Sequence, residues 1–76
     1  MLAPIALFVY NRPTHTRKTL AALEANTLAE DSEIYIFSDG AKTAQDVDAV
    51  NQVRSIIREP WKFKHIFIII TLYQRY

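Results

Sequence analysis

Two short polar clusters contain the residues of this chain that could carry out chemistry. They are Tyr10-Asn11-Arg12 and Asp39-Gly40, and each directly follows an apolar run. The ring of Tyr10 could stack on a nucleobase, and the carboxylate of Asp39 could accept a hydrogen bond from a ring N–H of that base. Arg12 could meet a phosphate group. These residue types predict a nucleotide-binding site, provided that the fold brings the two clusters together.

Each of these residues also has a purely structural explanation. An aromatic residue at a strand end is more often packed against the protein than stacked on a ligand, and Asp-Gly is a common turn. A single arginine in a loop is usually solvated. The joint placement of Tyr10 and Asp39 is therefore the feature that favours a ligand.

Three apolar runs predict the strands that would position the clusters. They are rich in β-branched and aromatic residues and cover residues 5–10, 33–38 and 63–71. Between the first two runs, good helix formers follow Pro13 as far as residue 26. A second helical pattern occupies residues 43–59, and Thr43 with Asp46 at its start resembles a capping box.

This alternation predicts an α/β fold, β-α-β-α-β, with an open parallel sheet of strand order 3-2-1. Right-handed crossovers then place both helices on one face of the sheet and leave the other face bare. The candidates for the bare face are Phe8, Tyr10, Tyr35, Phe37, Phe67 and Ile69. We expect the chain to form a homo-oligomer through this face or through the free edge of the third strand.

Ligands of open α/β sheets bind beyond the carboxyl ends of the strands. The two polar clusters follow neighbouring strands of the predicted sheet, so we expect them to lie side by side at that end. The predicted nucleotide-binding residues are Tyr10, Asn11, Arg12, Asp39 and Gly40.

Length and composition exclude several other classes of function. The 76 residues make at most one domain, and the formal net charge of +1, with scattered basic residues, argues against nucleic-acid binding. The chain has no cysteine, so a thiolate zinc site is excluded. No apolar run reaches the roughly 20 residues of a spanning helix. We therefore expect no transmembrane segment and a cytoplasmic location.

Three stretches of the sequence resemble the opening of GT-A-type, family-2-like glycosyltransferases. They are residues 5–13 (IALFVYNRP), residues 19–23 (TLAAL) with Asn26-Thr27, and residues 34–40 (IYIFSDG). The resemblance implies a Rossmann-like half of a GT-A fold. It also implies that Tyr10 stacks near the base of a nucleotide-sugar donor and that Asp39 accepts a hydrogen bond from that base.

The sequence departs from this family in two respects. Ser38 stands where the family often has another aspartate, and the tail beyond Lys64 no longer resembles it. The family's later Asp-x-Asp motif holds Mg²⁺ or Mn²⁺ with the donor diphosphate. Asp46 and Asp48 have that spacing but lie on the opening turn of the predicted second helix, where carboxylates favour the helix dipole, so we do not expect them to be its counterpart. The catalytic base of inverting members has no counterpart either. We expect residues 1–76 to form an incomplete glycosyltransferase domain, a subdomain that binds its nucleotide-sugar weakly, without a cofactor, and does not transfer the sugar alone.

The alternative is a non-catalytic structural module that only self-associates through its bare sheet face. Two other classes of protein are excluded by the turn after the first strand. A signalling receiver domain needs an acidic cluster there, and a Rossmann dinucleotide site needs a glycine-rich turn. Tyr10-Asn11-Arg12 provides neither, and Gly40 is the single glycine of the chain.

Overall fold

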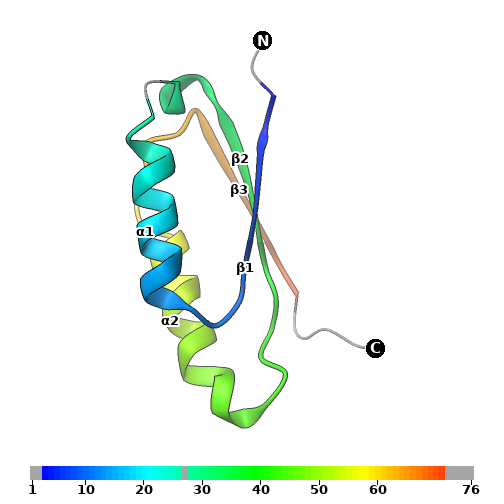
Figure 1. Ribbon diagram of the computed structural model, residues 1–76. Helices are drawn as coiled ribbons and strands as arrows, with labels where there is room; N and C mark the ends of the chain where they lie inside the picture. Colours follow the sequence, from blue (N-terminus) through cyan, green and yellow to red (C-terminus); the bar gives the residue numbers. More distant parts are fainter. Residues whose placement is uncertain (1–2, 27, 72–76) are drawn as a thin grey trace.

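A three-stranded parallel sheet carries two helices on one face in the computed structural model, which describes residues 3–26 and 28–71 (Figure 1). The elements in chain order are β1 (Ile5–Val9), α1 (Pro13–Glu24), the 3₁₀ turn η1 (Ala29–Asp31), β2 (Glu33–Ser38), the 3₁₀ turn η2 (Ala44–Asp46), α2 (Val47–Ile57) and β3 (His65–Ile70). Thr27 and the end of the divergent tail, residues 72–76, lie outside the described residues.

The strand order β1-β2-β3 confirms the prediction, since it is the order 3-2-1 read from the opposite edge. Both strand pairs are parallel and in register, so that Leu7 lies opposite Ile36 and Ile36 lies opposite Ile68. Both crossovers contain a helix, and α1 and α2 lie on the same side of the sheet (Figure 1). The carboxyl ends of all three strands therefore meet at one end of the molecule.

The hydrophobic core lies between this sheet and the two helices. Alternate residues of β2 point into it, and α2 contributes residues at helical spacing, as the sequence pattern predicted. Its fully buried apolar side chains are Leu20, Ile34, Ile36, Val53 and Ile57. The core is one layer deep, because nothing in the described part of the chain covers the other face of the sheet.

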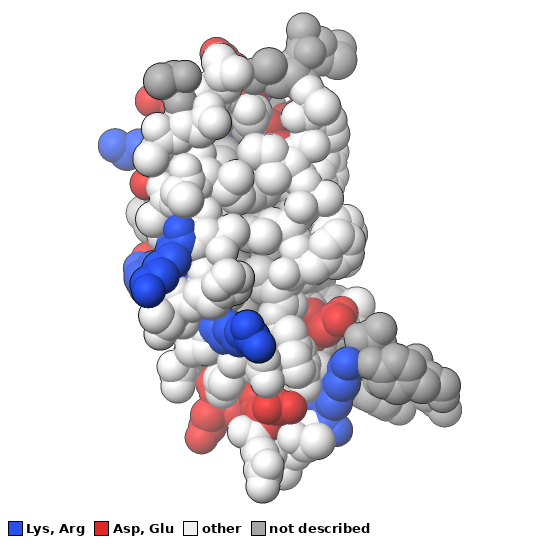
Figure 2. Space-filling view, in the orientation of Figure 1, with Lys and Arg blue, Asp and Glu red and all other residues white. Residues whose placement is uncertain are grey.

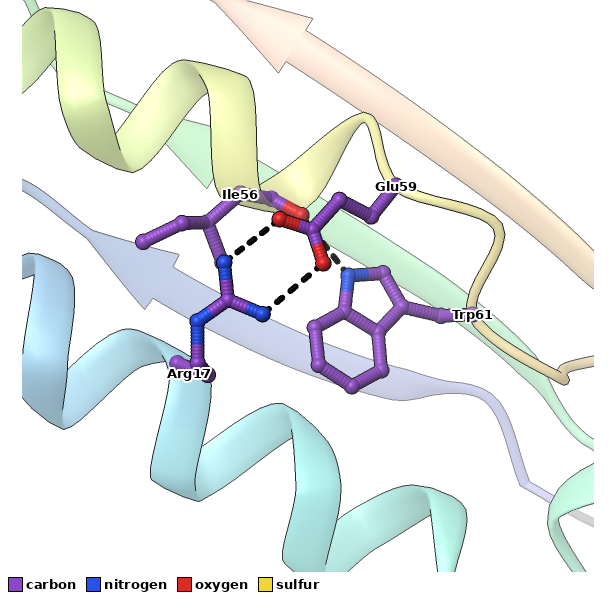
Figure 3. A network of polar contacts seen from close by, with 4 residues as sticks. All are labelled: Arg17, Ile56, Glu59 and Trp61. Carbon is purple, nitrogen blue, oxygen red and sulfur yellow. Dashed lines mark hydrogen bonds and ion pairs between the residues drawn. The ribbon is translucent and has the colours of Figure 1, made fainter.

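A polar clasp ties α1 to the segment that follows α2 (Figure 3). The guanidinium of Arg17 donates two hydrogen bonds to the carboxylate of Glu59, at 2.8 and 2.5 Å. Arg17 holds the pKa of the Glu59 carboxyl below its usual value. Beside this pair the indole Nε1 of Trp61 donates to the carbonyl oxygen of Ile56 at 2.8 Å. Trp61 thus packs at the rim of the core and fixes the turn that leads into β3.

The face of the sheet opposite the helices carries five of the six predicted residues, all except Tyr10, which follows the end of β1. Phe8 stacks on Phe37 with ring centroids 4.9 Å apart, and Tyr35 stacks on Phe67 at 4.7 Å. Phe8 is 76% exposed and Phe67 is 41% exposed, although both are large apolar side chains. We call this surface the aromatic face; its residues are Ala6, Phe8, Tyr35, Phe37, Phe67 and Ile69.

The first helix is shorter than the sequence pattern predicted. It ends at Glu24, with Ala25 as its C-cap, and no described residue has a positive φ. Asn26 therefore does not take the left-handed conformation of a C-terminal cap. Its side-chain Oδ1 instead accepts a hydrogen bond from the backbone N–H of Leu28 at 2.9 Å, which starts the connection to η1.

Candidate functional site

A cleft of about 450 Å³ lies at the carboxyl end of β1, walled by that edge strand and the first turns of α1. Its lining residues are Leu7, Phe8, Val9, Tyr10, Asn11, Arg12, His15, Thr16, Thr19 and Asp39. Four of the five residues predicted to bind a nucleotide are among them. The fifth, Gly40, is buried beside the cleft and does not line it.

Backbone pairing with β1 continues one residue past the end of β2 and brings the two predicted clusters together. The N–H of Asp39 donates to the carbonyl oxygen of Val9 at 3.3 Å. Asp39 therefore lies beside the strand end that leads into Tyr10, as the parallel topology predicted. The two side chains line one cleft but make no hydrogen bond with each other, since each is held by a different neighbour.

Tyr10 is held by the loop that precedes α2. Its hydroxyl donates to Oδ2 of Asp46 at 2.8 Å and accepts from the backbone N–H of Lys42 at 2.9 Å. The Lys42 ammonium lies over the Tyr10 ring, with Nζ 5.4 Å from the ring centroid. Burial raises the pKa of the Tyr10 phenol, and the hydrogen bond to Asp46 adds to the rise. Because the hydroxyl has both partners inside the protein, the ring is the part of Tyr10 that can contact a ligand.

Asp46 is the residue of this site that the sequence reading missed. Its carboxylate accepts hydrogen bonds from the Tyr10 hydroxyl, from Nδ2 of Asn11 at 3.1 Å and from Oγ1 of Thr43 at 3.2 Å. The bonds from Asn11 and then Tyr10 are the main reasons that the pKa of the Asp46 carboxyl is lowered. This carboxylate joins the end of β1 to the loop of residues 41–46, which passes below the strand ends in Figure 1.

The capping box that the sequence predicted from Thr43 and Asp46 is not formed. Thr43 is extended, with φ −137° and ψ 160°, and makes no side-chain cap. A 3₁₀ turn then separates it from α2, so the Asp46 carboxylate faces the end of β1 instead of the backbone N–H of Thr43. An aspartate before a helical pattern ordinarily indicates a cap. The partners of Asp46 are Tyr10 and Asn11, which lie 36 and 35 residues earlier in the chain, and the sequence around Asp46 does not indicate them.

Asp39 is oriented by the end of β3. Its Oδ1 accepts a hydrogen bond from Oγ1 of Thr71 at 3.3 Å. Arg54 of α2 holds this strand end in turn, since Nη2 donates to the carbonyl oxygen of Thr71 at 2.7 Å and Nε donates to the Oγ of Ser38 at 3.1 Å. Ser38 stands where the glycosyltransferase family often has an aspartate. Its buried hydroxyl accepts the hydrogen bond from Arg54.

Arg12 and His15 provide the basic side chains of the cleft. Arg12 is exposed at the N-cap of α1 without a side-chain capping bond, and Pro13 occupies the first helical position. No acidic residue lies in the first turn of α1. Figure 2 shows acidic and basic side chains close together toward the lower end of the molecule, where the strands end.

Gly40 does not supply the left-handed turn that its sequence context suggested. Its φ is not positive, and it is buried directly after Asp39.

Two kinds of feature were not found in residues 3–26 and 28–71. No three His, Cys, Asp or Glu side chains gather there as a metal-binding group would require. No helix within these residues combines the length and apolar character needed to cross a membrane.

Comparisons with known proteins do not place this chain in a family. Its sequence matches no protein-family model, and searches of curated proteins and of solved structures gave no match. The resemblance to family-2-like glycosyltransferases therefore stays a hypothesis, carried by the sequence stretches named above.

Proposed function

We propose that the cleft at the carboxyl end of β1 binds the nucleoside of a nucleotide-sugar, as in the Rossmann-like N-terminal half of a GT-A-type, family-2-like glycosyltransferase. The supporting observation is that Tyr10 and Asp39, from two neighbouring strand ends, line one cleft of about 450 Å³. Small-molecule sites in proteins typically measure about 300–1,000 Å³. The position also agrees with the general location of ligands in open parallel sheets.

In this proposal each residue of the cleft contacts a different part of the ligand or holds a residue that does. The Tyr10 ring stacks on the base, and Asp39 accepts a hydrogen bond from a base N–H through Oδ2, since Thr71 occupies Oδ1. Arg12, at the start of α1, is placed to meet a phosphate. Asn11 acts indirectly, because its amide is bound to Asp46.

The proposal assigns donor binding to this chain and no sugar transfer. The one Asp-x-Asp triplet of the sequence, Asp46-Val47-Asp48, stands at the start of α2. Its Asp46 carboxylate already accepts hydrogen bonds from Tyr10, Asn11 and Thr43, so these residues do not fit the Mg²⁺ or Mn²⁺ that the family's motif holds. No catalytic step is therefore derived through it.

A titration of the isotope-labelled chain with uridine diphosphate, followed by NMR, tests this proposal. A cleft with so few polar contacts should bind with a dissociation constant of about 1 mM. Adenosine and guanosine diphosphates serve as competitors and show which base is preferred. If none of these nucleotides binds, the proposal is wrong.

As a second candidate we propose a non-catalytic module that associates with a second copy through the aromatic face. The favouring observation is the exposure of Phe8, Phe67 and Ile69 on one side of a sheet. The charged groups among the strand residues on this side, Glu33 and His65, pair with each other at 3.2 Å. A second copy placed on this face by a two-fold axis would therefore meet little like-charge repulsion.

Self-association would be abolished by a charge on the aromatic face. Light scattering should show the mass of the wild-type chain rising with concentration, and Phe67→Lys should remain monomeric because its ammonium could not be buried without a partner. Val47→Lys is the matched control, since Val47 is also an exposed apolar residue but lies at the start of α2. A wild-type chain that is cleanly monomeric at micromolar concentration would contradict this candidate.

A further inference from the structure

We infer that Asp46 is a positioning residue of the cleft, whose carboxylate fixes Tyr10 and Asn11 in the orientation that a nucleoside would meet. This inference rests on the proposed function of the cleft. It assigns a binding role to a residue that does not itself line the cleft and that the sequence pattern marked only as part of a helix start.

The geometry separates Asp46 from an ordinary helix-terminal carboxylate. Its two oxygens divide their contacts: Oδ1 accepts from Asn11 Nδ2, and Oδ2 accepts from the Tyr10 hydroxyl and from Thr43 Oγ1. Two of these three donors line the cleft, and both stand at the end of β1. A carboxylate that only interacted with the helix dipole of α2 would not accept hydrogen bonds from side chains at the end of β1.

The Tyr10 ring is therefore fixed at two points, its backbone and its hydroxyl. The same hydroxyl also accepts from the N–H of Lys42, so the loop of residues 41–46 and the ring hold each other in place. A ring fixed before the ligand arrives loses little conformational freedom on binding, which favours affinity. Without Asp46 the hydroxyl would lose the hydrogen bond that it donates, and the ligand would have to complete the ordering of the ring.

The test compares Asp46→Asn with Asp48→Asn. The first substitution keeps the size of the side chain and one acceptor oxygen, but it removes the charge and leaves either Tyr10 or Asn11 without its acceptor. Uridine diphosphate should bind about fivefold more weakly to Asp46→Asn, the loss expected for one typical hydrogen bond. Asp48→Asn removes the same charge from the exposed first turn of α2 and should bind within about twofold of wild type.

A measurement without ligand separates this inference from the proposed function. NMR titration of the Tyr10 ring carbon should show a lower phenol pKa in Asp46→Asn than in wild type, because the neighbouring negative charge is gone. Spectra of the backbone amides confirm that the variant is folded. Tyr10→Phe identifies the Tyr10 signal and keeps the ring.

A double-mutant cycle completes the test. If Asp46 acts through the Tyr10 hydroxyl, the losses from Tyr10→Phe and Asp46→Asn should be less than additive in the double variant. Additive losses, unchanged binding in Asp46→Asn, or an unchanged Tyr10 pKa would each overturn the inference. If the wild-type chain binds no nucleotide, the proposed function fails as well, and the Tyr10 pKa then shows whether Asp46 is a structural contact only.

Discussion

Replacing Ile36 by alanine is expected to lower the free energy of unfolding by about 3 kcal/mol, within the usual range for deleting a buried isoleucine. Ile36 is 0% exposed, on the central strand β2, and lies between Leu7 of β1 and Ile68 of β3. A chain of this size is stabilised by roughly 4–11 kcal/mol in total. The variant should therefore melt about 10–25 °C below wild type, as circular dichroism can measure.

Ile69→Ala is the matched control for this stability prediction. It deletes the same atoms from the aromatic face, where Ile69 is 38% exposed, and should cost less than about 1 kcal/mol in dilute solution. Equal losses at the two positions would contradict the one-sided core. They would mean that the aromatic face is covered in solution, which is the result expected from self-association.

Replacing Asp39 by asparagine is expected to weaken uridine diphosphate binding about tenfold or more, because a charged acceptor becomes an uncharged amide. The amide of the variant retains Oδ1 for the Thr71 hydroxyl, so the fold and the end of β3 should be preserved. Its Nδ2 donor would then replace the oxygen that is proposed to face the N–H of the base. Binding is followed by NMR titration of both proteins.

Asp31→Asn controls for the change in net charge. Asp31 is exposed on η1, at the opposite end of the sheet from the cleft (Figure 1). We expect this variant to bind the nucleotide as wild type does. If Asp39→Asn also binds as wild type, Asp39 has no part in recognising the base.

The fold could be predicted from the sequence because strands and helices are indicated by local patterns of apolar residues. Period-two burial in β2 and helical spacing of Val50, Val53 and Ile57 fix which faces are buried. The handedness of the crossovers then places both helices on one face and leaves the aromatic face open. Helix boundaries were less well predicted, since the end of α1 and the start of α2 depend on side-chain contacts with Leu28 and with the end of β1.

The candidate site could be predicted only in part. Parallel topology was enough to bring Tyr10 and Asp39 to one end of the sheet, because strand ends are set by the order of elements. The contacts that orient these two side chains come from Asp46 and Thr71, each more than thirty residues away. Such pairs follow from the path of loops across the strand ends, which no periodicity in the sequence specifies.

The most direct measurement of the central claim is a residue-resolved map of where uridine diphosphate binds. Backbone amide shifts during the titration should change at Tyr10, Asn11, Arg12 and Asp39 together, and should leave residues 29–31 at the far end of the sheet unaffected. Shifts confined to the aromatic face, or no saturable shift at any residue, would show that the cleft at the end of β1 is not a nucleotide site.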